Sequence, residues 1–167
     1  MNIHPIFVHF PIAFLTVYAV AELLRFKKLT SQQWWWNTKA IMLLVGVLGG
    51  IAALITGNMA EAIVGPSALV EMHSTYAFIT IVIFAIILFA YKIRACELFL
   101  PQFVARPIVT HIFRVVSPIA RFIFMIAPAL ALVGLITVTI AGALGGAIAY
   151  GPDVDPVVKV VYSLLIK

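Results

Sequence analysis

The sequence predicts an all-α integral membrane protein, a four-helix bundle whose N-terminus and C-terminus both lie in the periplasm. Hydrophobic residues make up 64% of the 167 residues and charged residues only 10%, whereas a soluble domain carries about 25% charged residues. Four apolar segments approach or exceed the length of about 20 residues that a helix needs to cross roughly 30 Å of hydrocarbon. We therefore expect a single transmembrane domain over residues 1–167.

The predicted spans are residues 5–24, 40–63, 72–91 and 122–148. At this length and apolarity, a buried helix of a soluble protein is a poor alternative. The second and fourth spans carry small residues at helical spacing, such as Gly46 and Gly50 in the second and Gly142 and Gly146 in the fourth. Small residues let helix backbones approach closely. Ordinary bundle packing is one interpretation, and room for a flat cofactor is the other.

The orientation follows from the basic residues. Nine of the eleven lysines and arginines flank the first and third connections: Arg25, Lys27, Lys28, Lys39, Lys92, Arg94, Arg106, Arg114 and Arg121. Because basic residues next to spans stay in the cytoplasm, we expect these two connections there. The second connection and both termini then face the periplasm. The sequence accordingly predicts a multi-pass protein of a bacterial inner membrane.

Two stretches outside the spans are apolar in part. The third connection, residues 92–121, mixes apolar side chains with prolines and arginines, which is typical of an amphipathic segment on the cytoplasmic membrane surface. The tail, residues 152–167, is apolar but too short to span. We expect it on the periplasmic surface or docked on a partner. Near the inner end of the first span, Glu22 is expected to pair with Arg25 or to reach toward the headgroups.

Several function classes are disfavoured. The formal net charge of +5 does not indicate nucleic-acid binding, because the cations flank apolar runs and form no stripe interleaved with aromatics. The single cysteine, Cys96, allows no CxxC pair and no CxxCH haem attachment. P-loop, GxSxG and HExxH motifs are absent, so we expect no independent catalytic activity. A transporter would need polar residues through the middle of the membrane.

Histidines are the best candidates for a functional site. The predicted topology places His4, His9 and His73 in the same periplasmic leaflet, and leaves His111 in the third connection. Ionisable residues in a membrane are functional candidates because their burial is costly. His4 and His9 are five residues apart, about 140° around a regular helix. Pro11 removes a backbone hydrogen bond and is expected to kink the first turns of the helix, which could swing His4 toward the bundle.

Three interpretations of these histidines stay open. His9 and His73 could be the axial ligands of a b-type haem between the first and third spans. Alternatively, His4, His9 and His73, together with Glu71 or Glu61, could bind Zn²⁺ or Cu²⁺. They could also be structural, with hydrogen bonds to backbone carbonyls. Asn58, at the end of the second span, could cap its helix or hydrogen-bond a histidine or a haem propionate.

The chain also resembles a bacterial family of predicted four-span membrane proteins, domain of unknown function 2231. Residues 4–13 (HPIFVHFPIA) resemble the opening pattern of that family. Residues 54–57 (LITG) with the following His73, and residues 145–150 (GGAIAY) with 154–157 (VDPV), are similar to its later motifs. Where the family pattern has a second glycine before the valine, this chain reads Gly151-Pro152-Asp153-Val154.

This resemblance implies the four-span fold and the importance of His4, His9 and His73. Relatives joined to cytochrome-like domains imply electron transfer. The expected function is thus a redox-associated membrane subunit that binds b-type haem near the periplasmic face. It would pass electrons to or from other membrane subunits or a periplasmic electron carrier. The alternatives are a non-catalytic accessory subunit of a larger membrane complex and a Zn- or Cu-binding membrane protein.

Overall fold

The computed structural model describes residues 4–24 and 26–166, so Arg25 and Lys167 lie outside the described residues. The described chain forms α1 (His4–Leu23), α2 (Lys27–Thr30), α3 (Gln33–Val64), α4 (Ala68–Phe99), α5 (Pro101–Val104), α6 (Pro107–Tyr150) and α7 (Pro156–Leu165). Four of these helices, α1, α3, α4 and α6, are long and apolar enough to cross a membrane. The predicted all-α, four-span architecture is confirmed.

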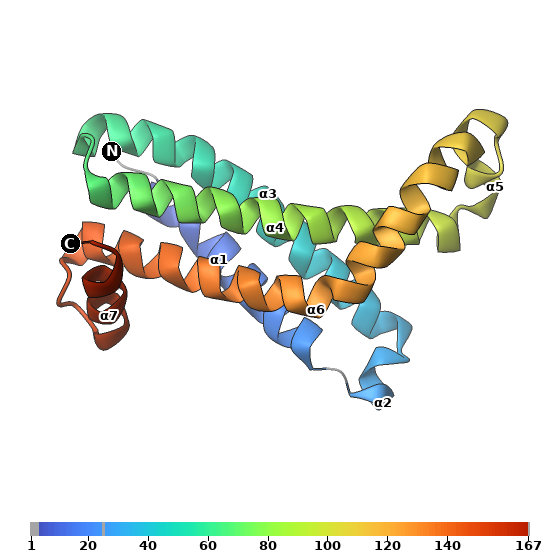
Figure 1. Cartoon of the computed structure of the whole chain (residues 1–167), viewed down its shortest axis with the longest axis horizontal. Helices are drawn as coiled ribbons and strands as arrows, with labels where there is room; N and C mark the ends of the chain where they lie inside the picture. The colour runs from blue at the N-terminus through green and yellow to red at the C-terminus, as the bar shows by residue number, and fades with distance from the viewer. Residues whose placement is uncertain (1–3, 25, 167) are drawn as a thin grey trace.

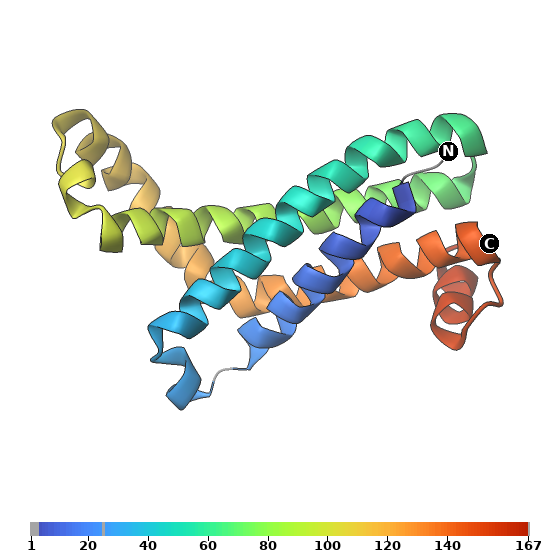
Figure 2. The ribbon, with the colours of Figure 1, turned by 180° about the vertical axis from the view of Figure 1, so that it is seen from behind.

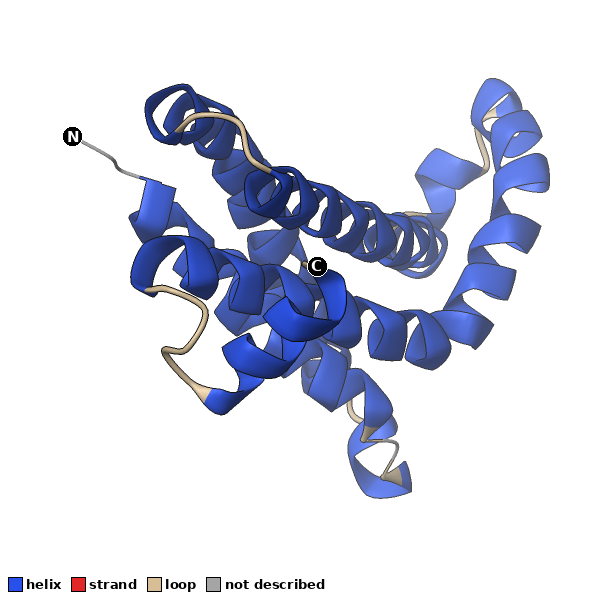
Figure 3. Cartoon of the chain, turned by 60° about the vertical axis from the view of Figure 1, so that its left-hand side comes forward, coloured by secondary structure: helices blue, strands red, loops and turns tan. Residues whose placement is uncertain are grey.

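The four long helices form a bundle joined by short loops (Figure 3). α1 packs against α3 and α6, and α4 packs against the same two helices. α1 and α4 therefore lie diagonally across the bundle from each other. α1 begins at the end of the bundle where α6 ends (Figure 1). The assignment of this end to the periplasm rests on the charge rule and stays a prediction.

Helices α4 and α6 extend well beyond the predicted third and fourth spans. α4 continues to Phe99 and α6 already begins at Pro107, so most of the predicted connection, residues 92–121, is helical. These extensions form an arm with α5 at its tip, which projects from one end of the bundle (Figures 1 and 2). The length of an apolar segment predicts where a helix leaves the hydrocarbon region. The helix itself can continue beyond that point. The expected place of this arm on the membrane surface stays a prediction.

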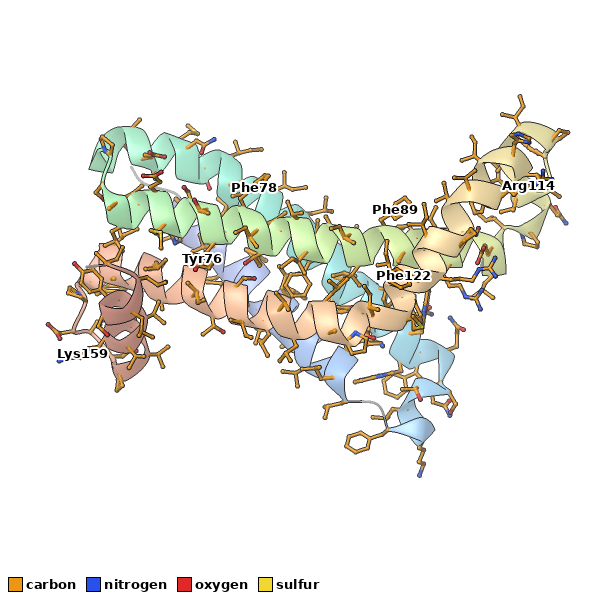
Figure 4. The ribbon with its side chains drawn as sticks, viewed as in Figure 1. Tyr76, Phe78, Phe89, Arg114, Phe122 and Lys159 are labelled. Atoms are coloured by element: carbon orange, nitrogen blue, oxygen red, sulfur yellow. The ribbon has the colours of Figure 1, made fainter. Side chains whose placement is uncertain are left out.

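α6 changes direction where the arm meets the bundle, near Phe122 (Figure 4). Two prolines, Pro118 and Pro128, lie inside this 44-residue helix. A proline removes one backbone hydrogen bond and crowds the preceding turn, which bends a helix. The bend lets α6 pack in the bundle at one end and follow the arm at the other.

Small residues let neighbouring helices interlock. A Cβ added to Gly46 would lie 2.4 Å from a methyl carbon of Leu15, and one on Gly134 would lie 2.6 Å from the Phe84 ring. Both large side chains are fully buried. These glycines therefore serve ordinary bundle packing. On the outside, Phe78 and Phe89 of α4 are 60% and 44% exposed (Figure 4), as expected for side chains that face lipid.

At the arm end of the bundle, the buried carboxylate of Glu22 accepts hydrogen bonds from three described side chains. Glu22 is 3% exposed, and its Oε2 accepts from Nζ of Lys39 at 2.7 Å and from the hydroxyl of Tyr91 at 2.8 Å. The hydroxyl of Tyr18 donates to the same oxygen at 3.3 Å. Trp36 stacks on Tyr91, with 5.4 Å between ring centroids. We name these five residues the Glu22 cluster; it ties α1, α3 and α4 together.

The structure gives Glu22 an ion-pair partner that was not expected from the sequence. Arg25 lies outside the described residues, and the carboxylate is buried rather than extended toward the surface. Among the described residues, Lys39 on the neighbouring antiparallel helix forms an ion pair with it. Trp36 is partly buried and packs against the core, whereas Trp34 is 55% exposed. Opposite charges that flank one short connection are a sequence signal for such a pair.

The tail forms α7 and packs on its own chain. Asp155 begins the helix, because its carboxylate accepts from the N–H groups of Val157 and Val158 at 2.8 and 2.9 Å. Val158 is buried against Ala143 and Ala147 of α6. Other apolar residues of α7, among them Leu164, stay exposed. The expected contact of the tail with the membrane surface or a partner stays a prediction.

The ion pair yields a stability prediction. Lys39→Met removes the cation that lies 2.7 Å from the buried Glu22 carboxylate, and breaking a buried pair costs about 3–5 kcal/mol. We expect a clearly lower melting temperature in detergent, while Lys28→Met, which changes an exposed lysine, melts like the wild type. The double variant Glu22→Gln/Lys39→Met carries no buried charge and should recover part of the loss. Equal melting of the two single variants would contradict the assignment.

Candidate histidine site

Two of the predicted site residues, His4 and His73, meet at the end of the bundle opposite the arm. Their ring centroids are 6.4 Å apart and their planes stand at 82°. His4 is the first residue of α1, and His73 lies in the second turn of α4. Because α1 and α4 are diagonal, the two rings approach each other across the interior of the bundle. We name these residues the histidine pair.

A backbone carbonyl holds His73. Its Nδ1–H donates to the carbonyl of Ala141 on α6 at 2.9 Å. Since a carbonyl can only accept, Nδ1 carries the proton, and in the neutral ring the lone pair lies on Nε2. A hydrogen bond from one ring nitrogen that orients the other is the usual support of a metal-ligating histidine.

A hydroxyl group holds His4. Nδ1 of His4 lies 3.1 Å from Oγ1 of Thr56 on α3. The hydroxyl hydrogen of Thr56 is directed to the carbonyls of Ala52 and Ala53, at 3.0 and 3.2 Å. Its oxygen is therefore placed to accept from Nδ1–H of His4. Thr56 is buried, so this contact fixes the ring to the second span from inside the bundle.

Each ring of the histidine pair also lies against a glycine. A Cβ added to Gly145 would lie 3.0 Å from Cε1 of His73, and one added to Gly57 would lie 3.3 Å from Cε1 of His4. Both distances are shorter than ordinary van der Waals contact. The backbones of α3 and α6 thus approach the imidazoles at positions where larger residues would push the rings away.

The structure does not bring His9 into this site. The His9 side chain is exposed, and its Nδ1–H donates to the carbonyl of Pro5 in its own helix. α1 is one continuous helix through Pro11, so the five residues between His4 and His9 turn the His9 side chain about 140° away from that of His4. The structure therefore brings His4, rather than His9, close to His73.

Asn58 lies outside the site as well, since its side chain is exposed. Thr56, two residues before Asn58 on α3, is the residue that accepts a hydrogen bond from His4. Thr56 had no assigned role in the sequence, although it belongs to the LITG motif of residues 54–57. His111 is exposed on the arm, as its place in the third connection predicted.

The metal-ion interpretation needs more ligands than the pair supplies. Glu71 is exposed in the first turn of α4, and Glu61 lies beyond Thr56 on α3. Among residues 4–24 and 26–166, no group of three or more His, Cys, Asp or Glu side chains is close enough to hold a metal ion.

The glycine contacts allow a direct test of the His73 geometry. Gly145→Ala should displace the ring and weaken its hydrogen bond to Ala141, because the new Cβ would lie 3.0 Å from Cε1. In ¹⁵N spectra of histidine-labelled protein, we expect an Nδ1–H signal that is missing in His73→Gln and altered in Gly145→Ala. Gly142→Ala is the matched control, since its Cβ meets only Ile12 at 3.9 Å. An unchanged His73 signal in Gly145→Ala would refute the geometry.

Comparisons with known proteins agree with this architecture. A family model described as "Predicted membrane protein (DUF2231)" matches residues 1–155. Neither a search of curated proteins nor a search of solved structures found a significant match. The matched region includes all four long helices and both members of the histidine pair. The resemblance noted in the sequence is confirmed: this chain is a multi-pass membrane protein of the DUF2231 family.

Proposed function

We propose that this protein is a redox subunit of a bacterial inner membrane that holds a b-type haem between His4 and His73. The observation that carries the proposal is the histidine pair itself. Two imidazoles from diagonal helices point into one bundle, and a hydrogen bond through Nδ1 anchors each. Four-helix bundles build cofactor sites from such inward side chains on facing helices.

The spacing of the rings fits two imidazoles on one iron. A ligating nitrogen lies about 2 Å from its metal ion and roughly 1 Å from the centre of its own ring. Two imidazoles on opposite sides of an ion therefore have centroids about 6 Å apart, against 6.4 Å for the pair. Haem iron needs only two axial ligands from the protein, whereas Zn²⁺ takes three or four. The pair therefore favours haem over a Zn²⁺ or Cu²⁺ ion.

The neighbouring residues would hold both imidazoles in place as ligands. Gly57 and Gly145 leave the backbones of α3 and α6 without side chains beside the rings. The hydrogen bonds that His4 and His73 donate to Thr56 and Ala141 would hold both imidazoles in one orientation and increase their basicity as ligands. A bound b-type haem would supply reversible one-electron transfer.

The charge rule puts this end of the bundle in the periplasmic leaflet. Electrons would accordingly pass between another subunit in the membrane and a periplasmic electron carrier.

One feature favours a second role, as an accessory subunit of a larger membrane complex. The arm and α7 expose large apolar side chains, including Ile108 at 79% and Leu164 at 71%. Such residues suit contact with lipid or with other membrane subunits. This role is compatible with haem binding.

The haem proposal has a spectroscopic test. Protein purified from cells supplied with a haem precursor should show a Soret band and a low-spin spectrum, with haem b in the pyridine haemochrome assay. His4→Ala and His73→Ala should each abolish the low-spin spectrum. His9→Ala, which removes an exposed imidazole from the same helix, should leave it unchanged. Absence of haem from the folded wild type, or loss of the spectrum in His9→Ala alone, would overturn the proposal.

A further inference from the structure

A second site lies at the other end of the bundle, where α4 and α6 enter the arm. A cavity of about 180 Å³ opens between them, lined by Arg94, Glu97, Ala120, Arg121 and Phe124. We name it the arginine cavity. It combines two guanidinium groups with an aromatic wall, and the histidine pair has no part in it.

The charges of the cavity favour an anion. Nη1 of Arg94 donates to Oε2 of Glu97 at 3.2 Å, and the Arg94 side chain is still 45% exposed. Glu97 is less exposed, at 19%, and Ser117 on α6 is a further hydrogen-bond partner. One carboxylate therefore faces two arginines, which leaves a net positive charge. Arginine forks match the geometry of phosphate oxygens.

By helix length, the cavity lies about one hydrocarbon thickness from the histidine pair. Tyr91 of the Glu22 cluster lies eighteen residues after His73 on α4, or about 27 Å at 1.5 Å per residue. That distance is close to the roughly 30 Å of hydrocarbon. Arg94 follows one turn beyond Tyr91. Phe124 packs on the Tyr91 ring, with centroids 5.3 Å apart, and so joins the cavity to the apolar core.

Apolar side chains continue from the cavity toward the bundle on the outer surface. Phe89 of α4 and Phe122 of α6 lie on the two sides of the crossing between these helices (Figure 4), and they are 44% and 58% exposed. A ligand with its anionic group at the arginines would have an apolar surface beside it. A soluble anion would make no use of that surface, whereas the acyl chains of a lipid would.

We propose that the arginine cavity binds the phosphate of an anionic phospholipid headgroup. Basic pockets between transmembrane helices on the cytoplasmic side are suited to such headgroups, and the charge rule assigns this end to that side. Bound lipid would bridge α4 and α6 at the base of the arm. The proposal is independent of haem binding, and either can fail without the other.

The test measures lipid retained by the full-length protein in native mass spectrometry. Protein in neutral detergent is mixed with phosphatidylglycerol, with phosphatidylcholine, or with inorganic phosphate. We expect phosphatidylglycerol to be retained about tenfold more than phosphatidylcholine, since each basic residue near the surface adds to the attraction. Inorganic phosphate should not compete at equal concentration, because it lacks acyl chains.

Two matched double variants separate the cavity from general charge. Arg94→Gln/Arg121→Gln should lose about tenfold of the phosphatidylglycerol retention. Lys92→Gln/Arg114→Gln removes the same charge from two exposed residues of the arm that do not line the cavity, and should retain the lipid within twofold. If the glutamine pair fails to fold, Arg94→Lys/Arg121→Lys keeps the charge and should still weaken binding through loss of the forked contacts.

Other outcomes would overturn the proposal. Equal loss of phosphatidylglycerol retention in the two glutamine variants would mean that the net charge of the arm attracts the lipid and that the arginine cavity is not a specific site. Equal retention of phosphatidylcholine would exclude selection of an anionic headgroup. Competition by inorganic phosphate as strong as that by phosphatidylglycerol would indicate a free-phosphate site instead of a lipid site. Full retention by the lysine pair would exclude a role for the guanidinium forks.

Discussion

Hydrocarbon offers no water to a polar side chain, so each such group inside a membrane must find its partner within the protein. This constraint explains where the polar residues of the bundle lie. On α1, His4 and Glu22 are eighteen residues apart, and on α4 the same interval separates His73 from Tyr91. Eighteen residues make five turns and span about 27 Å. Both helices thus present one polar residue at each end on a single face, one hydrocarbon thickness apart.

The contacts of these residues join different helices at the two ends. The Glu22 cluster links α1, α3 and α4 beside the arm, while the histidine pair is held by Thr56 on α3 and by Ala141 on α6. Midway, the hydroxyl of Thr80 on α4 donates to that of Thr137 on α6 at 2.9 Å. A shift of one helix along its neighbour by a single residue would break contacts at both ends. Polar contacts therefore determine the register of the bundle, and close glycine contacts determine its width.

The two ends nevertheless differ in chemistry. In the Glu22 cluster, cation, carboxylate and hydroxyl groups satisfy one another in a buried and fully packed site, which suits a structural role. In the histidine pair, the Nδ1 atoms are engaged with neighbouring helices, and glycine backbones lie beside both rings. That arrangement holds the two imidazoles 6.4 Å apart across the interior of the bundle.

The sequence by itself determined the number, order and approximate position of the four spans, because apolar length is a local property of the chain. It also placed the three histidines at one end, since alternating spans bring His4, His9 and His73 to the same side. The eighteen-residue intervals were present in the sequence too, but periodicity cannot say which face of a helix points inward. Only the tertiary structure decided that His4, rather than His9, meets His73, that Lys39 forms an ion pair with Glu22, and that α4 and α6 continue as an arm. These outcomes depend on the rotation of each helix and on the choice of its neighbours, which the packing of all four helices sets together.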